Sequence, residues 1–174
     1  MLPNIQERYD SLSTKRRELL QRLETYSADM LSFKAGPDKW SATEAIEHLV
    51  VVEDNFLEQV KTNIPVSSLD PEKRSPKNYQ IVLKVMRKDV VVDVPHESME
   101  PRGQYSMTEL VERWDAIRDK MRVLLEEIDV KRAQDMVYKH PYAGPLNMAE
   151  TLAFIDVHFD NHARHMDVIL ARAE

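Results

Sequence analysis

The stretch that decides the fold of this chain reads, from residue 106 to residue 128, SMTELVERWDAIRDKMRVLLEEI. Its apolar side chains recur alternately every three and every four residues. They are Met107, Leu110, Trp114, Ile117, Met121, Leu124 and Ile128. Because an α-helix has 3.6 residues per turn, this spacing puts them on one stripe, which is typical of a helix packed in a bundle.

Three further segments carry the same apolar period and predict three more helices. They run from Asn4 to about Met30, from Ala42 to about Asn63, and from Met148 nearly to the end of the sequence. Three of the four predicted helices begin with a capping box, in which Ser or Asn is followed three residues later by Glu. These pairs are Ser41 with Glu44, Ser106 with Glu109, and Asn147 with Glu150. Caps and period agree, which favours an all-α four-helix bundle.

The chain length and the connections refine this architecture. With 174 residues, the chain is expected to form a single domain over 1–174. The connection at 64–105 is longer than an antiparallel turn requires, so we expect a crossover between helices two and three, with a short helix at Tyr79–Met86 and an extended piece at Val90–Val94. Residues 130–146 are predicted to be a second irregular link.

The composition excludes several classes of protein. The chain has no cysteine, so any metal must be held by His, Asp or Glu. Its net charge of −6 and the absence of a contiguous basic stretch predict no nucleic-acid binding. No apolar run approaches the roughly 20 residues needed to span a membrane, and the N-terminal stretch is too charged for a signal segment. We therefore expect no membrane association and a cytoplasmic location.

Three of the six histidines lie within predicted helices at positions that suit a metal ion. His158 and His162 are four residues apart, so both imidazoles project from one face. His162 lies in the apolar stripe, where an unpaired imidazole costs desolvation free energy. His48 borders the inward stripe of the second helix. If helices two and four are antiparallel, the three rings lie at similar heights in the bundle.

This histidine set indicates the kind of ion and leaves one alternative open. Three neutral imidazoles without a thiolate suit Zn²⁺ or Ni²⁺ better than Mg²⁺ or Ca²⁺. Three protein ligands leave a coordination position open, as in catalytic zinc sites. In the alternative, the three histidines are hydrogen-bonded helical residues that hold no ion, and their spacing alone does not exclude this.

Two motifs resemble those of a known family. Residues 40–49, WSATEAIEHL, are similar to the W-S-x-x-E-x-x-x-H-L opening of the second helix in DinB/YfiT-like proteins. The closing segment of that family resembles a second motif here, which is His140-Pro141-x-x-Gly144-Pro145-Leu146, then Glu150 and His158-x-x-x-His162. The resemblance covers the whole chain in order and length. It implies a four-helix bundle that holds a divalent metal, often zinc or nickel, on His48, His158 and His162.

The resemblance also implies partners and a range of reactions. Members are frequently homodimers, and some are thiol-dependent transferases or isomerases that use a low-molecular-weight thiol, whereas many others have no established reaction. One departure is His165, where many relatives carry glutamine. His165 is either a group next to the metal ligands or a residue of the helix surface.

Three other residues have two interpretations each. Glu44 lies one turn before His48 and could orient that imidazole, although its capping box already explains it. Trp40 is expected either to pack over the end of the bundle or to form a wall of the substrate pocket. His140 precedes a proline in a predicted loop, where it either reaches the cleft as a proton donor or lies at the surface.

Three functions stay open at this point. The first is a metal-dependent enzyme, a thiol transferase or a hydrolase, that takes a small-molecule substrate and whose catalytic residues beyond the metal ligands cannot be named. The second is a non-catalytic metal-binding or stress-related interaction protein, and the third is a helical scaffold without a metal. A deep pocket beside the open coordination position favours the enzyme, and a closed apolar shell favours the second function.

Overall fold

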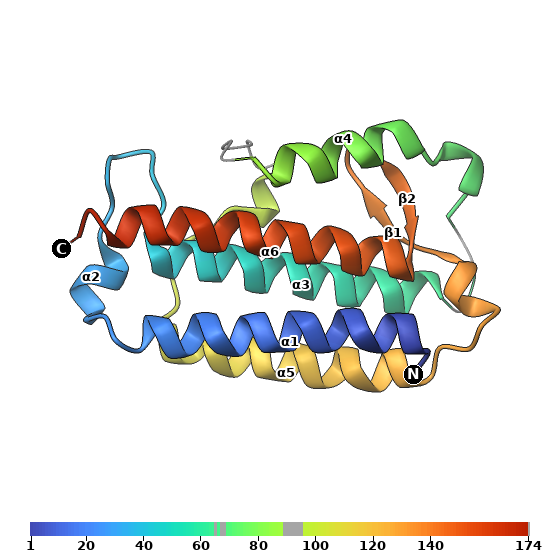
Figure 1. Cartoon of the computed structure of the whole chain (residues 1–174), viewed down its shortest axis with the longest axis horizontal. Helices are drawn as coiled ribbons and strands as arrows, with labels where there is room; N and C mark the ends of the chain where they lie inside the picture. The colour runs from blue at the N-terminus through green and yellow to red at the C-terminus, as the bar shows by residue number, and fades with distance from the viewer. Residues whose placement is uncertain (65, 67–68, 89–95, 174) are drawn as a thin grey trace.

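The four periodic segments form four long helices in the computed structural model of this chain, which describes residues 1–64, 66, 69–88 and 96–173. The helices are α1 (Pro3–Leu23), α3 (Ala42–Asn63), α5 (Met107–Glu126) and α6 (Met148–Leu170) (Figure 1). All three predicted capping boxes are present, at the starts of α3, α5 and α6. The predicted four-helix bundle is therefore confirmed.

The first helix is shorter than the apolar period predicts. We expected it to continue to about Met30, but α1 ends at Leu23 and a separate short helix, α2, spans Ala28–Ser32. Side chains explain the break, because the Thr25 hydroxyl donates to the carbonyl of Arg22, and the Ser27 hydroxyl accepts from the N–H of Met30. Such local bonds compete with the helical ladder, and here they end one helix and start the next.

The order of directions in the bundle explains the long connection. α1 and α6 run in one direction, and α3 and α5 run in the other (Figure 1). α1 packs against α6 and α3 packs against α5, so each of these pairs is parallel. The chain must therefore return along the bundle between α3 and α5, which confirms the predicted crossover.

Part of this crossover is helical. The predicted short helix is α4 (Pro76–Met86), which begins at the N-cap Ser75 and packs against α6. Two 3₁₀ turns, η1 (Pro71–Lys73) and η2 (Glu97–Met99), lie before and after it. The piece at Val90–Val94, which we expected to be extended, lies outside the described residues.

Residues 130–146 are more regular than we predicted. A 3₁₀ turn, η3 (Arg132–Gln134), leads into an antiparallel hairpin of β1 (Met136–His140) and β2 (Gly144–Asn147). Gly144 has a φ of 75°, and the Lys73 carbonyl oxygen lies where a side chain at this position would begin. Two strands this short carry too little alternation to be recognised in the sequence, so the predicted irregular link was wrong here.

One ion pair lies within the bundle core. Nε and Nη2 of Arg118 on α5 donate to Oε2 and Oε1 of Glu53 on α3, at 2.6 and 2.7 Å. The two residues are only 5% and 1% exposed. The Tyr9 hydroxyl on α1 donates to the backbone carbonyl of Arg118, so this cluster joins three helices. None of the described helices is both long and apolar enough to cross a membrane.

Candidate metal centre

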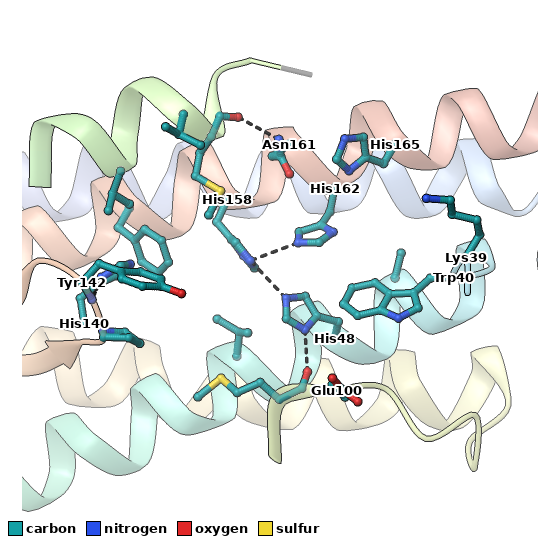
Figure 2. Close-up of a pocket in the computed structure, with 18 of the residues that line it drawn as sticks. Lys39, Trp40, His48, Glu100, His140, Tyr142, His158, Asn161, His162 and His165 are labelled. Carbon is teal, nitrogen blue, oxygen red and sulfur yellow. Dashed lines mark hydrogen bonds between the residues drawn. The ribbon is translucent and has the colours of Figure 1, made fainter. Parts of the chain in front are cut away.

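The structure brings His48, His158 and His162 together at one point between α3 and α6. Figure 2 shows the three rings pointing toward one another from the two antiparallel helices. Nε2 of His158 lies 3.2 Å from Nε2 of His48 and 3.1 Å from Nε2 of His162. One ligand atom from each residue lies within 4.8 Å of the other two.

These spacings fit a shared ion. Two imidazole nitrogens on one tetrahedral zinc ion, each 2.0–2.1 Å from it, lie about 3.3 Å apart. Without an ion, the three nitrogens cannot satisfy one another, because each neutral ring offers either a lone pair or a single N–H at Nε2. Nε2 of His158 can therefore make a good hydrogen bond with only one of its two neighbours, and the other close contact is left unsatisfied, which is unfavourable away from water.

The backbone beside the site sets the orientation of His48. Nδ1 of His48 lies 2.7 Å from the carbonyl oxygen of Met99 in η2, so Nδ1 carries the proton and donates it. This leaves the Nε2 lone pair toward the other two histidines, as is usual for metal-binding imidazoles. The same loop is held a second time, because the N–H of Gly103 donates to Oε2 of Glu47 at 2.8 Å.

All three rings are neutral at pH 7. Burial lowers the pKa of His48, against the opposing effect of its bond to Met99. Burial lowers the pKa of His158 well below its ordinary value, and the neighbouring His162, His48 and His140 add to this. Burial and the nearby His48 and His165 lower the pKa of His162 to about 3. Protons therefore do not compete with a cation for these nitrogens at neutral pH.

Trp40 forms one wall of the site. Its ring lies 4.9 Å from that of His48 and stacks on that of His162 at 5.9 Å and 17°. Of the two interpretations of Trp40, the structure therefore places it at the pocket. Glu44 instead closes the capping box with the N–H of Ser41 and pairs with Lys34 at 2.7 Å. Both carboxylate oxygens of Glu44 are therefore bonded to residues other than His48, and Glu44 does not orient that imidazole.

His140 lies at the end of β1 and is only 4% exposed, so it is not a surface residue. Nδ1 accepts hydrogen bonds from the N–H groups of Tyr142 and Ala143, at 3.1 and 3.2 Å. Burial lowers the pKa of His140 to about 4, so the ring is neutral. The ring lines the cavity on the opposite side of the histidine cluster from Trp40 (Figure 2).

His165 lies beside the cluster rather than within it. Its ring meets that of His162 edge-on, at 6.2 Å and 86°, and it lines the same cavity. His165 is partly exposed, which separates it from the buried His158.

A cavity of about 1110 Å³ extends along these residues. Its lining includes the exposed side chains of Ile81, Tyr142 and Val168, so it opens to solvent. Apolar side chains from α3, α4 and α6 form much of the wall next to the histidines. They include Val52, Val82, Val85, Met86, Phe154 and Ile169. The three rings are thus reached by a deep pocket rather than covered by a closed apolar shell.

Two residues that position the site were missed in the sequence. Met99 acts through its carbonyl oxygen, for which no side-chain pattern exists. Asn161, which is 3% exposed, donates from Nδ2 to the carbonyls of Met86 and Lys88, at 3.0 and 3.2 Å. These bonds hold the end of α4 against α6 beside His162. A polar residue on the inward face next to His162 is the signal that could have indicated such a contact.

Comparison with known proteins identifies a family and two similar solved structures. The family model described as "DinB superfamily" matches residues 11–166. The structure of TT2238, described as a four-helix bundle protein, is 19% identical and has a TM-score of 0.59, with 94% of this chain and 98% of that chain covered. A second similar structure is YfiT from Bacillus subtilis, described as a probable metal-dependent hydrolase with an unusual four-helix bundle topology. It is 12% identical and has a TM-score of 0.62, with 99% of this chain and 89% of that chain covered. A search of curated proteins finds no match.

Proposed function

The chain belongs to the DinB superfamily. From this membership and from the facing nitrogens of the buried His48 and His158 and the partly buried His162, we propose that the chain is a divalent-metal-dependent hydrolase of small molecules. His48, His158 and His162 are the proposed ligands, and zinc or nickel is the proposed ion. The observation that carries this proposal is the pair of Nε2 to Nε2 distances, 3.2 and 3.1 Å.

The donor set fits such an ion. Neutral imidazoles are ligands that Zn²⁺ and Ni²⁺ accept, and a hard cation such as Mg²⁺ prefers oxygen. When bound, the ion supplies Lewis acidity, which makes water a nucleophile near neutral pH and polarises the acceptor oxygen. The remaining tasks belong to the chain. Met99 orients His48, and the stacked ring of Trp40 limits the movement of His162.

The cavity favours an enzyme over a non-catalytic metal protein. It reaches from solvent to the histidine cluster, so a small molecule can approach the proposed ion at the coordination position that the three histidines leave open. Its walls of Val82, Val85 and Phe154 exclude water around a bound apolar group, which strengthens electrostatic interactions there. The description of the structural neighbour YfiT as a probable metal-dependent hydrolase agrees with this proposal.

The extent of the cavity supports a second candidate, a thiol-dependent transferase. The cavity continues on both sides of the histidines, toward Lys39 and Trp40 on one side and toward His140 and Tyr142 on the other (Figure 2). This leaves room for two ligands, of which one would be a low-molecular-weight thiol. The two reactions differ in their requirement, since only the transferase needs the thiol for turnover.

Elemental analysis and an activity screen test the proposal together. Wild-type protein should contain one equivalent of zinc or nickel, and His158→Ala should contain none. His96→Ala is the matched control, because His96 is exposed and outside the cluster. The loaded protein is then incubated with a panel of chromogenic esters, with and without cysteine as the thiol. Metal content that is equal in all three proteins, or hydrolysis that chelation leaves unchanged, would contradict the proposal.

A further inference from the structure

One hydrogen-bond donor of the cavity, on the side chain of the buried residue His140, has a fixed direction and no assigned role. His140 is neutral, and its Nδ1 accepts two backbone N–H bonds, from Tyr142 and Ala143. Nδ1 must therefore carry the lone pair, which places the ring proton on Nε2. Among the residues that the structure describes, none accepts a hydrogen bond from this N–H.

These two bonds hold the ring of His140 in one orientation, in the same way that a side chain is held in an Asx turn. Asn and Asp commonly accept the N–H groups two and three residues later, and Nδ1 of His140 occupies that role here. A perpendicular contact with Phe154, at 4.6 Å and 85°, holds the ring from its other side. The Nε2–H donor is therefore preorganised before any ligand enters. Nε2 of His140 is not among the buried side-chain atoms that lack a partner, so it is reached from the cavity, where a ligand oxygen can accept its hydrogen bond.

The donor lies across the cavity from the proposed ligands. Phe154 contacts both rings, that of His140 and that of His158, the second at 5.5 Å. A molecule bound against the histidine cluster therefore has His140 on one flank and the apolar wall of α4 beside it. The surroundings thus combine the neutral donor of His140 with an apolar surface. The cationic side chains among the described lining residues, Lys39 and Arg172, are exposed, so they provide no buried positive charge that would select a phosphate or a sulfate.

We propose that His140 is a catalytic residue, whose Nε2–H donates a hydrogen bond to the carbonyl oxygen of a carboxylic ester with an apolar acyl group. This rests on the proposed function. In the reaction, the oxygen of water bonds to the carbonyl carbon, the bond to the alkoxy oxygen breaks, and a proton from water leaves with the alcohol. His140 gains and loses no proton. It stabilises the negative charge that builds on the carbonyl oxygen, as donors of an oxyanion hole do.

Two substitutions separate this role from a structural one. His140→Asn keeps an acceptor for Tyr142 and Ala143 but removes the donor from the cavity. His140→Gln keeps an N–H near the position of Nε2 but loses the acceptor of the turn. If His140 is catalytic, Asn lowers kcat for 4-nitrophenyl hexanoate by about 100-fold at an unchanged melting temperature. Gln then lowers the melting temperature and retains more activity than Asn. The reverse order of activities would overturn the proposal.

Binding and spectroscopy keep this test independent of turnover. Hexanoate, the product of that ester, should bind to the zinc-loaded His140→Asn protein about 10-fold more weakly than to wild type in calorimetry. Nitrogen-15 spectra at pH 7 should show the proton of His140 on Nε2. If wild type does not hydrolyse the ester but hexanoate binding depends on His140, the hydrolase proposal fails and the donor role stands. A proton on Nδ1, or hexanoate binding that is absent or equal in both proteins, would overturn the role of His140.

Discussion

Helix α3 carries two buried polar clusters only five residues apart, and they differ in how their bonding capacity is used. Around Glu53, both carboxylate oxygens accept from Arg118, and the Tyr9 hydroxyl completes the cluster from α1. Around His48, three imidazole nitrogens face one another beside an open cavity. In the first cluster each charge has its counter-ion, although Nη1 of Arg118 has no hydrogen-bond partner among the described residues. In the second cluster, the three nitrogens have no arrangement that satisfies them all without a ligand.

This difference separates two reasons for burying polar groups. The ion pair holds α3, α5 and α1 in register, so we expect its loss to affect folding. The histidine cluster pairs three like groups in an apolar setting, and it gains a favourable arrangement only when a cation joins it. We therefore expect its loss to affect binding far more than folding.

Breaking the ion pair should have the largest effect on stability. Arg118→Met leaves the Glu53 carboxylate buried without a counter-ion, and we expect the free energy of unfolding to fall by about 3–5 kcal/mol. Urea denaturation of the metal-free protein measures this change. The double variant Glu53→Leu and Arg118→Met should recover most of the loss, because no charge then remains buried. A single variant as stable as wild type would show that the pair does not organise the bundle.

Removing one proposed ligand should give the opposite result. We expect His162→Leu to weaken zinc binding by more than about 100-fold, because only two of the three ligands remain. Even the loss of a residue that hydrogen-bonds to a ligand lowers metal affinity by about 10–100-fold. The same change should alter the unfolding free energy of the metal-free protein by less than about 1 kcal/mol, because an apolar side chain suits this stripe. His165→Gln is the neighbouring control and should keep its zinc. A chelator competition and a urea titration measure the two quantities.

The hairpin histidine links stability to pH. The pKa of His140 is about 4 in the folded chain, and an unfolded histidine has a value near 6.5. Above pH 6.5 both states are neutral, and as the pH falls toward 4 only the unfolded state takes up the proton. This favours unfolding and should cost about 2–3 kcal/mol between pH 7.5 and 4.5.

The variant His140→Asn isolates this contribution. It lacks the titrating group. Between pH 7.5 and 4.5 its unfolding free energy should therefore fall by about 2–3 kcal/mol less than that of wild type. Urea denaturation at several pH values gives the comparison. Equal slopes in the two proteins would mean that His140 is protonated in the folded chain.

The helix caps should give the smallest effect. Ser41→Ala and Ser106→Ala each remove a side chain that accepts the N–H of the third helical residue, so each should cost about 1 kcal/mol in urea denaturation. Only Ser41→Ala should also weaken zinc binding, by a few-fold, because the start of α3 positions both Trp40 and His48. Equal zinc affinity in the two variants would uncouple the cap from the site.

The fold was predictable wherever one helix provides its own signal. Apolar spacing and capping boxes gave α3, α5 and α6 with accurate starts, because those interactions are local. The end of α1 was missed, since Thr25 and Ser27 interrupt a period that the apolar residues continue. The hairpin at β1 and β2 was missed because its strands are short and pack against a part of the chain distant in sequence, the 3₁₀ turn η1 that contains Lys73.

The site was predictable to the same degree. The spacing of His158 and His162 placed two rings on one face, and the position of His48 beside the inward stripe of the second helix indicated the third. The resemblance to a family supported the same set. The bond of His48 to Met99 could not be foreseen, because any residue offers a carbonyl oxygen. The burial of His140 was also hidden, since it depends on a hairpin that the sequence pattern does not indicate.

The parallel pairing of α1 with α6 has a consequence for biosynthesis. Lys15 on α1 contacts Asp156 and Asp160 on α6, so α1 needs a partner that the ribosome makes more than a hundred residues later. Until then its apolar stripe has no native neighbour from α6. Contacts so distant in the chain close slowly, and exposed apolar helices are targets for chaperones. Synthesis of this bundle should therefore depend on chaperones that act during translation more than that of an up-and-down bundle of equal length.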